Sequence, residues 1–169
     1  MKLQGTVWKF GDNVDTDLII PARFLNSFDK DELARNCFAD VRPGFMDLIS
    51  PGDIIVAGKN FGSGSSREHA PLAIKAAGIS GIIAETFARI FYRNAFNIGL
   101  PILESVEAPS CLEEGSRVSI DLATGEIVNV DTGERFLAKP VPSFMTAIID
   151  AGGLVEYIKK SGLTKGRTH

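Results

Sequence analysis

Residues 53–84, DIIVAGKNFGSGSSREHAPLAIKAAGISGIIA, decide the fold class of this chain. The stretch begins and ends with short, continuous apolar runs at residues 53–57 and 81–84. Such runs are typical of strands buried on both faces, as in parallel sheets. Between them, four apolar residues follow the spacing of a helical stripe: Ala70, Ala73, Ile74 and Ala77. Because Gly78 follows where helices commonly end, the stretch predicts a right-handed βαβ unit.

A second helix and a third strand are predicted directly after this unit. Residues 86–97 carry apolar side chains, Ile90 among them, on one helical stripe, and Arg89 and Arg93 on another. The helix leads into an apolar segment at residues 100–103 that predicts a strand. The two arginines fit either a solvated helix face or the support of a cleft or partner interface, and their spacing leaves both roles open.

The rest of the chain predicts a β-rich rim. Residues 117–122 and 126–130 alternate between polar and apolar side chains with a turn between them, which is typical of antiparallel strands. Residues 5–10 also predict a strand, and residues 144–151 predict a helix that two glycines end. We therefore expect an α/β fold with a mixed, partly parallel sheet.

Composition limits the possible partners and compartments. The 169 residues are 44% hydrophobic, which predicts one folded domain over residues 1–160 and a flexible tail at 161–169. The formal charge is −3 and basic residues do not cluster, so we expect neither a nucleic-acid nor a membrane-surface partner. Because the chain has no secretory-type leader and no apolar run near the roughly 20 residues of a membrane-spanning helix, we expect a cytoplasmic protein.

The metal-binding residue types are scarce. Cys37 and Cys111 lie too far apart in sequence for a metal-binding motif, and two thiols are fewer than the four that usually hold an iron–sulfur cluster. His69 and His169 are the only histidines, and His69 fits a helix start or a packing position better than a ligand. We therefore expect no metal bound by this chain.

The loop inside the βαβ unit carries the chemistry. Gly62 and Gly64 allow a close backbone approach, and Ser65, Ser66 and Arg67 follow them at the expected helix start. Unpaired N–H groups there favour a carboxylate or phosphate, a guanidinium binds a carboxylate bidentately, and N–H donors could stabilise a serine alkoxide that acts as a base. The loop lacks the Walker A, dinucleotide-binding and hydrolase patterns. A simple N-cap role for Ser66 is the alternative.

Three motifs in this chain resemble one known family. Residues 62–69, GSGSSREH, and residues 87–99, FARIFYRNAFNIG, together with the upstream DTDLIIP at residues 15–21, resemble the swivel domain of the aconitase superfamily. The resemblance runs from about Val7 to Glu104 and implies a single swivelling β/β/α domain. The chain length resembles that of the separate small subunits found in this superfamily.

The resemblance also implies a reaction and a partner. In the family, a 2-hydroxy acid loses water and the resulting enoic acid is rehydrated with the hydroxyl moved to the neighbouring carbon, a hydro-lyase step that serves leucine biosynthesis in one branch. A four-iron four-sulfur cluster held by a large subunit acts as the Lewis acid. We therefore expect a large iron–sulfur subunit, in a heterodimer or heterotetramer, and a small dicarboxylate substrate.

The motif positions imply roles for individual residues. Ser65 aligns with the family's catalytic base, and Asp17 aligns with the acid of the upstream motif that helps to organise the catalytic site. Ser66 and Arg67 align with contacts to the substrate carboxylate, and Gly64 belongs to the same substrate-binding loop.

Substrate choice in the family is set by the segment after the upstream motif, which we call the specificity segment: Phe24, Leu25, Asn26, Ser27 and Phe28. It has no Arg at position 26 and offers apolar side chains, which favours isopropylmalate over the tricarboxylate homoaconitate. The pair Asn26-Ser27 keeps 2,3-dimethylmalate or another methylated malate open as the substrate, and Arg23 could turn inward and supply a charge.

Two other functions stay open: a non-catalytic carboxylate- or phosphate-binding module, and an RNA-binding relative, which the acidic balance disfavours.

Overall fold

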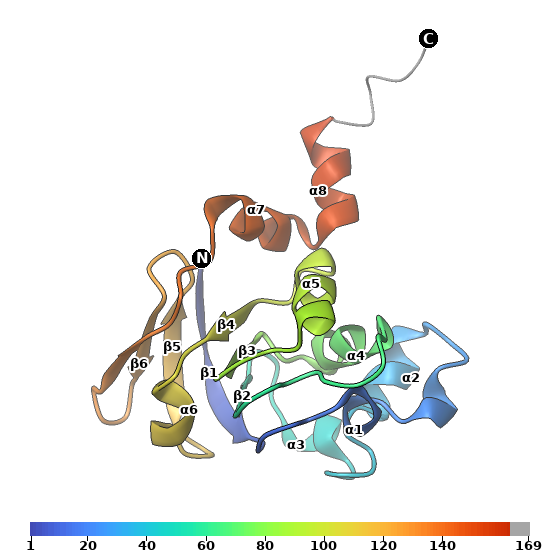
Figure 1. Cartoon of the computed structure of the whole chain (residues 1–169), viewed down its shortest axis with the longest axis horizontal. Helices are drawn as coiled ribbons and strands as arrows, with labels where there is room; N and C mark the ends of the chain where they lie inside the picture. The colour runs from blue at the N-terminus through green and yellow to red at the C-terminus, as the bar shows by residue number, and fades with distance from the viewer. Residues whose placement is uncertain (163–169) are drawn as a thin grey trace.

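The βαβ unit predicted around the glycine loop is confirmed by the computed structural model, which describes residues 1–162. It consists of β2 (Ile54–Ala57), α4 (His69–Ala77) and β3 (Gly81–Ala84) (Figure 1). Every residue of both strands is buried, and the strands pair in parallel. Burial on both faces is the physical reason why these strands read as continuous apolar runs.

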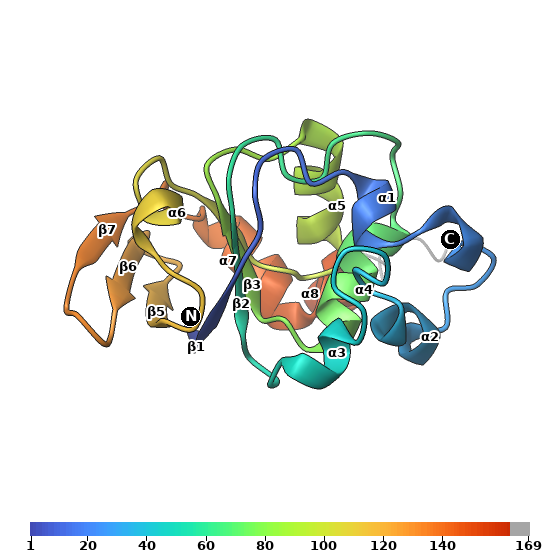
Figure 2. The same ribbon diagram turned by 90° about the horizontal axis from the view of Figure 1, so that it is seen from below.

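The sheet has seven strands in the order β4-β3-β2-β1-β5-β6-β7. Its other strands are β1 (Lys2–Lys9), β4 (Ile102–Glu104), β5 (Arg117–Asp121), β6 (Glu126–Asn129) and β7 (Arg135–Leu137). The first four strands are parallel, whereas β5, β6 and β7 continue the sheet in antiparallel fashion from the other side of β1. Figure 2 shows the antiparallel strands at one end of the molecule and α1 and α2 at the other. The predicted mixed sheet with a β-rich rim is thus confirmed.

The remaining elements are mostly short helices. They are α1 (Thr16–Ile19), the 3-10 helix η1 (Ala22–Phe24), α2 (Lys30–Arg35), α3 (Phe45–Leu48), α5 (Arg89–Asn97), α6 (Ala108–Cys111), α7 (Ser143–Ala151) and α8 (Leu154–Ser161). Helix α4 packs against both α2 and α5. Among residues 1–162, no helix combines the length and the apolar character needed to cross a membrane.

The structure differs from the sequence predictions at several places. Helix α5 begins at Arg89 rather than Thr86, because the backbone before it is extended and pairs with Phe61. Ile90, expected on the buried stripe, is 50% exposed. Strand β1 begins at Lys2 rather than Gly5, because its first residues pair with β5. Strand β7 and helix α8 were not predicted, and of the tail predicted at 161–169 only the end of α8 and the cap at position 162 lie within the described residues.

The segment between the specificity segment and β2 contributes to the core. Leu33, Cys37 and Phe38 are buried, and the Phe38 ring stacks on Phe10 with 4.3 Å between ring centroids. Burial raises the pKa of the Cys37 thiol well above its ordinary value. Cys37 is therefore a neutral packing residue.

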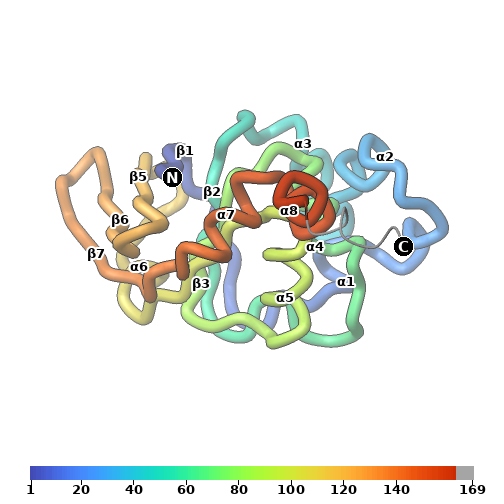
Figure 3. The backbone as a smooth tube through the Cα atoms, turned by 90° about the horizontal axis from the view of Figure 1, so that it is seen from above, coloured from blue at the N-terminus to red at the C-terminus, as the bar shows by residue number. Residues whose placement is uncertain are grey.

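Helices α7 and α8 are attached to the C-terminal end of α5 (Figure 3). The Lys75 ammonium on α4 donates to the carbonyl oxygens of Ile98 at 2.6 Å and Gly152 at 3.4 Å. These carbonyls end α5 and α7, where a cation is favoured by the helix dipole. Burial, followed by the charge of Lys30, lowers the pKa of Lys75 from its ordinary value.

Candidate active site

The serine loop, residues 61–68, is held in position by the chain segment that follows β1. The Gly62 amide donates to the Val14 carbonyl at 2.7 Å, and the Thr16 amide donates to the Ser63 carbonyl at 2.9 Å. The Thr16 hydroxyl, on a residue only 3% exposed, donates to the Ser65 carbonyl at 2.8 Å. Three hydrogen bonds thus join the two segments that carry the family motifs.

Gly62 allows the serine loop to lie directly on α5. Its φ is +82°, a left-handed conformation that non-glycine residues adopt only at a cost. A Cβ at this position would lie 2.2 Å from Cγ of the buried Phe91. No residue with a side chain fits this approach, which explains the need for glycine here.

The helix begins later than the sequence predicted. Helix α4 starts at His69, and its N-cap residue Glu68 makes no side-chain capping bond. The N-cap alternative for Ser66 is therefore wrong, and so is the expectation that Ser65 to Arg67 form the first helical turn. Within residues 1–162, however, the backbone N–H groups of residues 64–67 have no hydrogen-bond acceptor. An anion here would be bound by the loop itself and not by the helix terminus.

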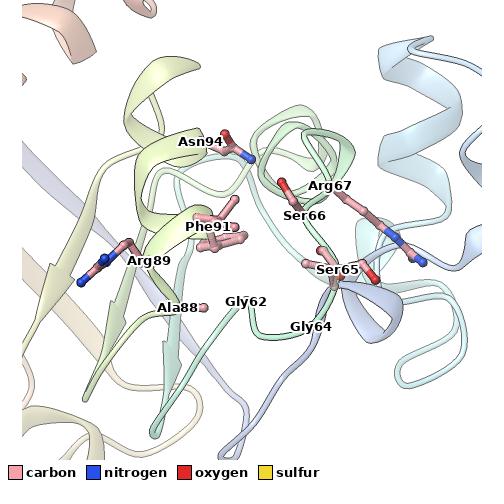
Figure 4. Close-up of a pocket in the computed structure, with 11 residues that line it drawn as sticks. Gly62, Gly64, Ser65, Ser66, Arg67, Ala88, Arg89, Phe91 and Asn94 are labelled. Carbon is pink, nitrogen blue, oxygen red and sulfur yellow. The ribbon is translucent and has the colours of Figure 1, made fainter.

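Both serine hydroxyls are available to a ligand. Ser65 and Ser66 are exposed, and neither hydroxyl has a hydrogen-bond partner in the described part of the chain. Figure 4 is a close-up of the pocket between the serine loop and α5. It shows the two serine side chains there, with Asn94 of α5 nearby and Arg67 extending toward the other side of the loop. The two hydroxyls and the unpaired N–H groups beside them form a set of donors for an oxyanion.

Arg67 forms an ion pair with Asp17 of α1. The Arg67 side chain is 15% exposed and Asp17 is 64% exposed, so the guanidinium is partly shielded while the carboxylate lies at the surface. One terminal nitrogen, Nη1, makes the pair and also contacts the Ile20 carbonyl at 3.3 Å. Within residues 1–162, Nε and Nη2 have no acceptor, so one edge of the guanidinium remains for a carboxylate.

The two acids of the upstream motif have different roles. The Asp15 carboxylate accepts from the Leu18 amide at 2.9 Å and caps α1. This cap directs α1 so that Asp17, two residues on, reaches Arg67. The structure thereby brings together Asp17, Ser65, Ser66 and Arg67, which the sequence analysis selected.

Two pockets flank the serine loop and share Ser65, Ser66 and Arg67 in their walls. The first, of about 270 Å³, lies between the loop and α5, and its other lining residues are Thr16, Gly62, Gly64, Ala88, Arg89, Ile90, Phe91 and Asn94. The second, of about 450 Å³, lies on the side of the specificity segment, and its other lining residues are Leu25, Phe28, Glu68 and His69. A ligand at the shared residues would be in reach of both pockets.

The specificity segment contributes two apolar side chains to the second pocket. These are Leu25 and Phe28; Phe24, Asn26 and Ser27 do not line it. The Ser27 hydroxyl accepts from the Asp29 amide at 2.9 Å.

Arg23 turns away from the site. Its guanidinium makes a two-armed ion pair with Asp40, at 2.9 and 2.6 Å, and its side chain is 57% exposed. The hydrogen bond from this guanidinium is the main cause that lowers the pKa of Asp40, and the carboxylate in turn raises the pKa of Arg23. The positive charge of Arg23 is therefore paired at the surface and does not contribute to the second pocket.

The sequence did not point to two residues of the site, and it left the roles of Arg89 and Arg93 undecided. Thr16 holds the serine loop, and Asn94 lines the first pocket. Asn94 follows Phe91 by three positions, so the helical repeat would have placed both on one face of α5. Arg93 is exposed, and Figure 4 shows Arg89 pointing away from the serine loop, although its residue borders the pocket.

The metal-ligating side chains within residues 1–162 do not fit an iron–sulfur cluster. Cys37 is buried as a neutral thiol and Cys111 is exposed on α6. Within residues 1–162, no three His, Cys, Asp or Glu side chains are grouped closely enough to hold a metal ion. No step of the chemistry is therefore assigned to a metal on this chain.

The fold and the serine loop define a protein of the aconitase C-terminal domain class, and the model of that domain matches residues 49–107. The 3-isopropylmalate dehydratase small subunit of Halothermothrix orenii is 62% identical over 159 residues, covering 94% of this chain and 96% of that protein. The 2,3-dimethylmalate dehydratase small subunit of Eubacterium barkeri is 56% identical over 158 residues, covering 94% and 97%.

A solved structure agrees with these relatives. The 3-isopropylmalate dehydratase from Methanocaldococcus jannaschii superimposes with a TM-score of 0.91 and 44% identity, covering 99% of both chains. The chain belongs to the family of 3-isopropylmalate dehydratase small subunits, which are hydro-lyase subunits. A small subunit implies a large-subunit partner. The family resemblance and the aconitase-like fold expected from the sequence are thus confirmed.

Proposed function

We propose that this chain is the small subunit of an enzyme that interconverts 2-isopropylmalate and 3-isopropylmalate by dehydration and rehydration, a step of leucine biosynthesis. The observation that carries the proposal is the pair of exposed hydroxyls, Ser65 and Ser66, which have no partner within residues 1–162 and lie beside Arg67. The names of relatives that cover nearly the whole chain support the choice of reaction.

In the proposed reaction, Ser65 is the base. Its oxygen, as an alkoxide, takes the proton from the carbon next to the hydroxyl-bearing carbon; the C–H electron pair forms the C=C bond, and the C–O bond breaks with loss of hydroxide. The large subunit's cluster, when bound, would supply the Lewis acid that accepts this hydroxide. The unpaired N–H groups of residues 64–67 support this role, because preorganised donors stabilise a serine oxyanion. On rehydration the Ser65 hydroxyl gives its proton to the carbon that first carried the hydroxyl, and hydroxide adds to the carbon that lost its proton. The hydroxyl has then moved by one carbon, and Ser65 is an alkoxide again, ready for the next cycle.

The substrate carboxylates are proposed to bind beside this serine. Arg67 offers its free guanidinium edge, and Ser66 and the Gly64 amide offer further donors. Asp17 fixes the orientation of Arg67 through their ion pair. The large subunit would close the open side of the cleft and hold the iron–sulfur cluster, since the cysteines of this chain do not fit it.

The substrate's alkyl group is proposed to lie in the second pocket. Leu25 and Phe28 line this pocket and carry no charge, and Arg23, which directly precedes the specificity segment, is paired with Asp40. An isopropyl group gains from contact with such side chains, at roughly 0.8 kcal/mol for each buried CH₂. A third carboxylate would lose its hydration there, because Arg67 in the wall is already assigned to the other carboxylates and the neighbouring Glu68 would repel it.

The test is turnover by the assembled enzyme. The chain is produced with its large subunit under anaerobic conditions, and the isomerisation of 2-isopropylmalate is followed for the wild type and for Ser65→Ala. We expect kcat to fall by about 10²–10⁴-fold in the variant, the usual contribution of a general base. Ser143→Ala, which alters an exposed serine on α7, is the matched control and should retain the wild-type rate. A near-normal rate for Ser65→Ala would remove Ser65 from the base role.

A second candidate substrate is 2,3-dimethylmalate. It is favoured by the Eubacterium barkeri relative, whose 56% identity is close to that of the isopropylmalate relatives. The same assembled enzyme would be assayed with isopropylmalate, 2,3-dimethylmalate, homoaconitate and citrate. A higher kcat/KM for 2,3-dimethylmalate would establish the second candidate, and equal or better use of a tricarboxylate would exclude both.

A further inference from the structure

The specificity segment meets the start of α4, directly after the serine loop, through one aromatic contact. The Phe28 ring stacks on the His69 ring with 4.0 Å between centroids and 21° between planes. Both rings line the second pocket, next to Leu25 and the shared residues Ser65 and Arg67. The contact therefore joins the segment expected to sense the substrate's alkyl group to the helix that directly follows the serine loop.

The two rings differ in how firmly they are held. His69 is the first residue of α4, a nine-residue helix that packs against α2 and α5. Phe28 precedes α2, and it is 59% exposed although one face lies on the imidazole. The helix residue is thus the fixed surface, and the stack is what restrains the Phe28 side chain.

The imidazole contributes its ring face and not its nitrogen to this contact. Nε2 of His69 is buried and has no hydrogen-bond partner within residues 1–162. Burying a polar nitrogen without a partner disfavours the stacked arrangement, so the stacking and the shape of the pocket must outweigh this penalty. A residue of the same shape without nitrogens should hold Phe28 at least as well.

We propose that His69 is a positioning residue for substrate discrimination: its ring holds Phe28, and with it the wall formed by Leu25, at the distance from Ser65 and Arg67 that suits a branched alkyl substituent. The inference rests on the proposed function and adds to it the residue that sets the width of the alkyl pocket. His69 acts through Phe28 and takes no part in proton transfer.

The test measures discrimination between two malates that differ only in the alkyl group. The assembled enzyme is assayed with 3-isopropylmalate and 3-methylmalate. The ratio of kcat/KM for 3-isopropylmalate to kcat/KM for 3-methylmalate is then compared among variants. His69→Ala should lower this ratio about 3- to 10-fold, the size expected for loss of one aromatic pair. The change should come from a higher KM for isopropylmalate, with kcat within about twofold of the wild type.

His69→Phe, Phe28→Ala and the double variant of Phe28 and His69 separate stacking from other roles of His69. His69→Phe keeps the ring and should restore the wild-type ratio. Phe28→Ala should lower the ratio at least as much as His69→Ala, because it removes the stack and also a wall of the pocket. The double variant should lower the ratio no further than Phe28→Ala alone, because the stack is already lost. Phe144→Ala, a similarly exposed phenylalanine on α7 at 60%, is the matched control and should leave the ratio unchanged.

The outcomes are distinct. An unchanged ratio in Phe28→Ala overturns the proposal even if His69→Ala fails to fold, because Phe28 is exposed and its truncation leaves the core intact. An equal loss of kcat for both malates in His69→Ala and His69→Phe would give the nitrogen a catalytic role and also overturn it. A wild-type complex that turns over no alkylated malate would instead refute the proposed function.

Discussion

Replacing Gly62 with alanine would test directly how closely the serine loop must lie against α5. The backbone at position 62 would keep its φ of +82°, a conformation that costs about 1–2 kcal/mol for a residue other than glycine. The new Cβ would also lie 2.2 Å from Cγ and 2.4 Å from Cβ of Phe91. Phe91 is 2% exposed and packs edge-on against Phe61, which limits how far its ring can shift, and overpacking of this kind costs about 1–3 kcal/mol.

The expected loss of stability for Gly62→Ala is therefore about 2–5 kcal/mol, from backbone strain and overpacking together. For a domain of this size, that corresponds to a fall in Tm of about 4–20 °C. The free energy of unfolding would be measured by urea titration, followed by far-ultraviolet circular dichroism. In the assembled enzyme the same variant should also lose activity, because the loop that carries Ser65 would be displaced from Thr16.

Gly133 supplies a matched control for the backbone term. It has nearly the same φ, +80°, in the turn between β6 and β7, and no atom lies within 4 Å of the position that a Cβ would take. Gly133→Ala should therefore show only the strain of about 1–2 kcal/mol. If both variants lose the same stability, the contact between Gly62 and Phe91 does not limit the position of the loop, and the reasoning is wrong.

Four further predictions concern single side chains. Thr16→Val should lose about 1–3 kcal/mol in urea unfolding, because the hydroxyl that donates to the Ser65 carbonyl is removed from a buried site; a variant as stable as wild type would contradict this. Arg67→Lys should raise KM in the assembled enzyme more than it lowers kcat, because a point charge replaces a planar fork, and an unchanged KM would make Arg67 structural. In the native chain, exposed Cys111 should react rapidly with a thiol reagent and buried Cys37 only on unfolding. Because burial raises the pKa of Cys37, its stabilising contribution is complete at neutral pH and declines as pH rises above about 8.5, where the unfolded thiol ionises; Cys37→Ala should lack this decline.

The sequence predicted those parts of the fold that local patterns determine. Strands β2 and β3 are buried on both faces, so their continuous apolar runs identified them correctly. Helix α5 was started too early, because residues 86–88 have helical periodicity but pair in extended form with Phe61. Helix α8 was missed because none of its residues is buried, and its attachment depends on contacts with α5 and α7.

In the candidate site too, residues marked by a local pattern were predicted, and residues that depend on distant contacts were not. Ser65 and Arg67 were identified because the glycine loop itself indicates an anion site, whereas Asp17 entered only through the family motif. Thr16 was missed because its role depends on Ser65, 49 positions away in sequence, and no local pattern reports such a contact. The stack of Phe28 on His69 is equally nonlocal, since it joins the specificity segment to the start of α4.

The central position of β1 affects the order in which the chain can fold during synthesis. Residues 2–9 are made before the other strands and can pair with β2 early, but the opposite edge of β1 is completed only by β5, in which Arg117 pairs with Thr6. Until residue 117 has been made, one row of N–H and C=O groups on β1 has no partner strand. Such an open edge favours association between unfinished chains. Rapid, complete synthesis of the antiparallel strands would therefore protect the newly made chain from aggregation.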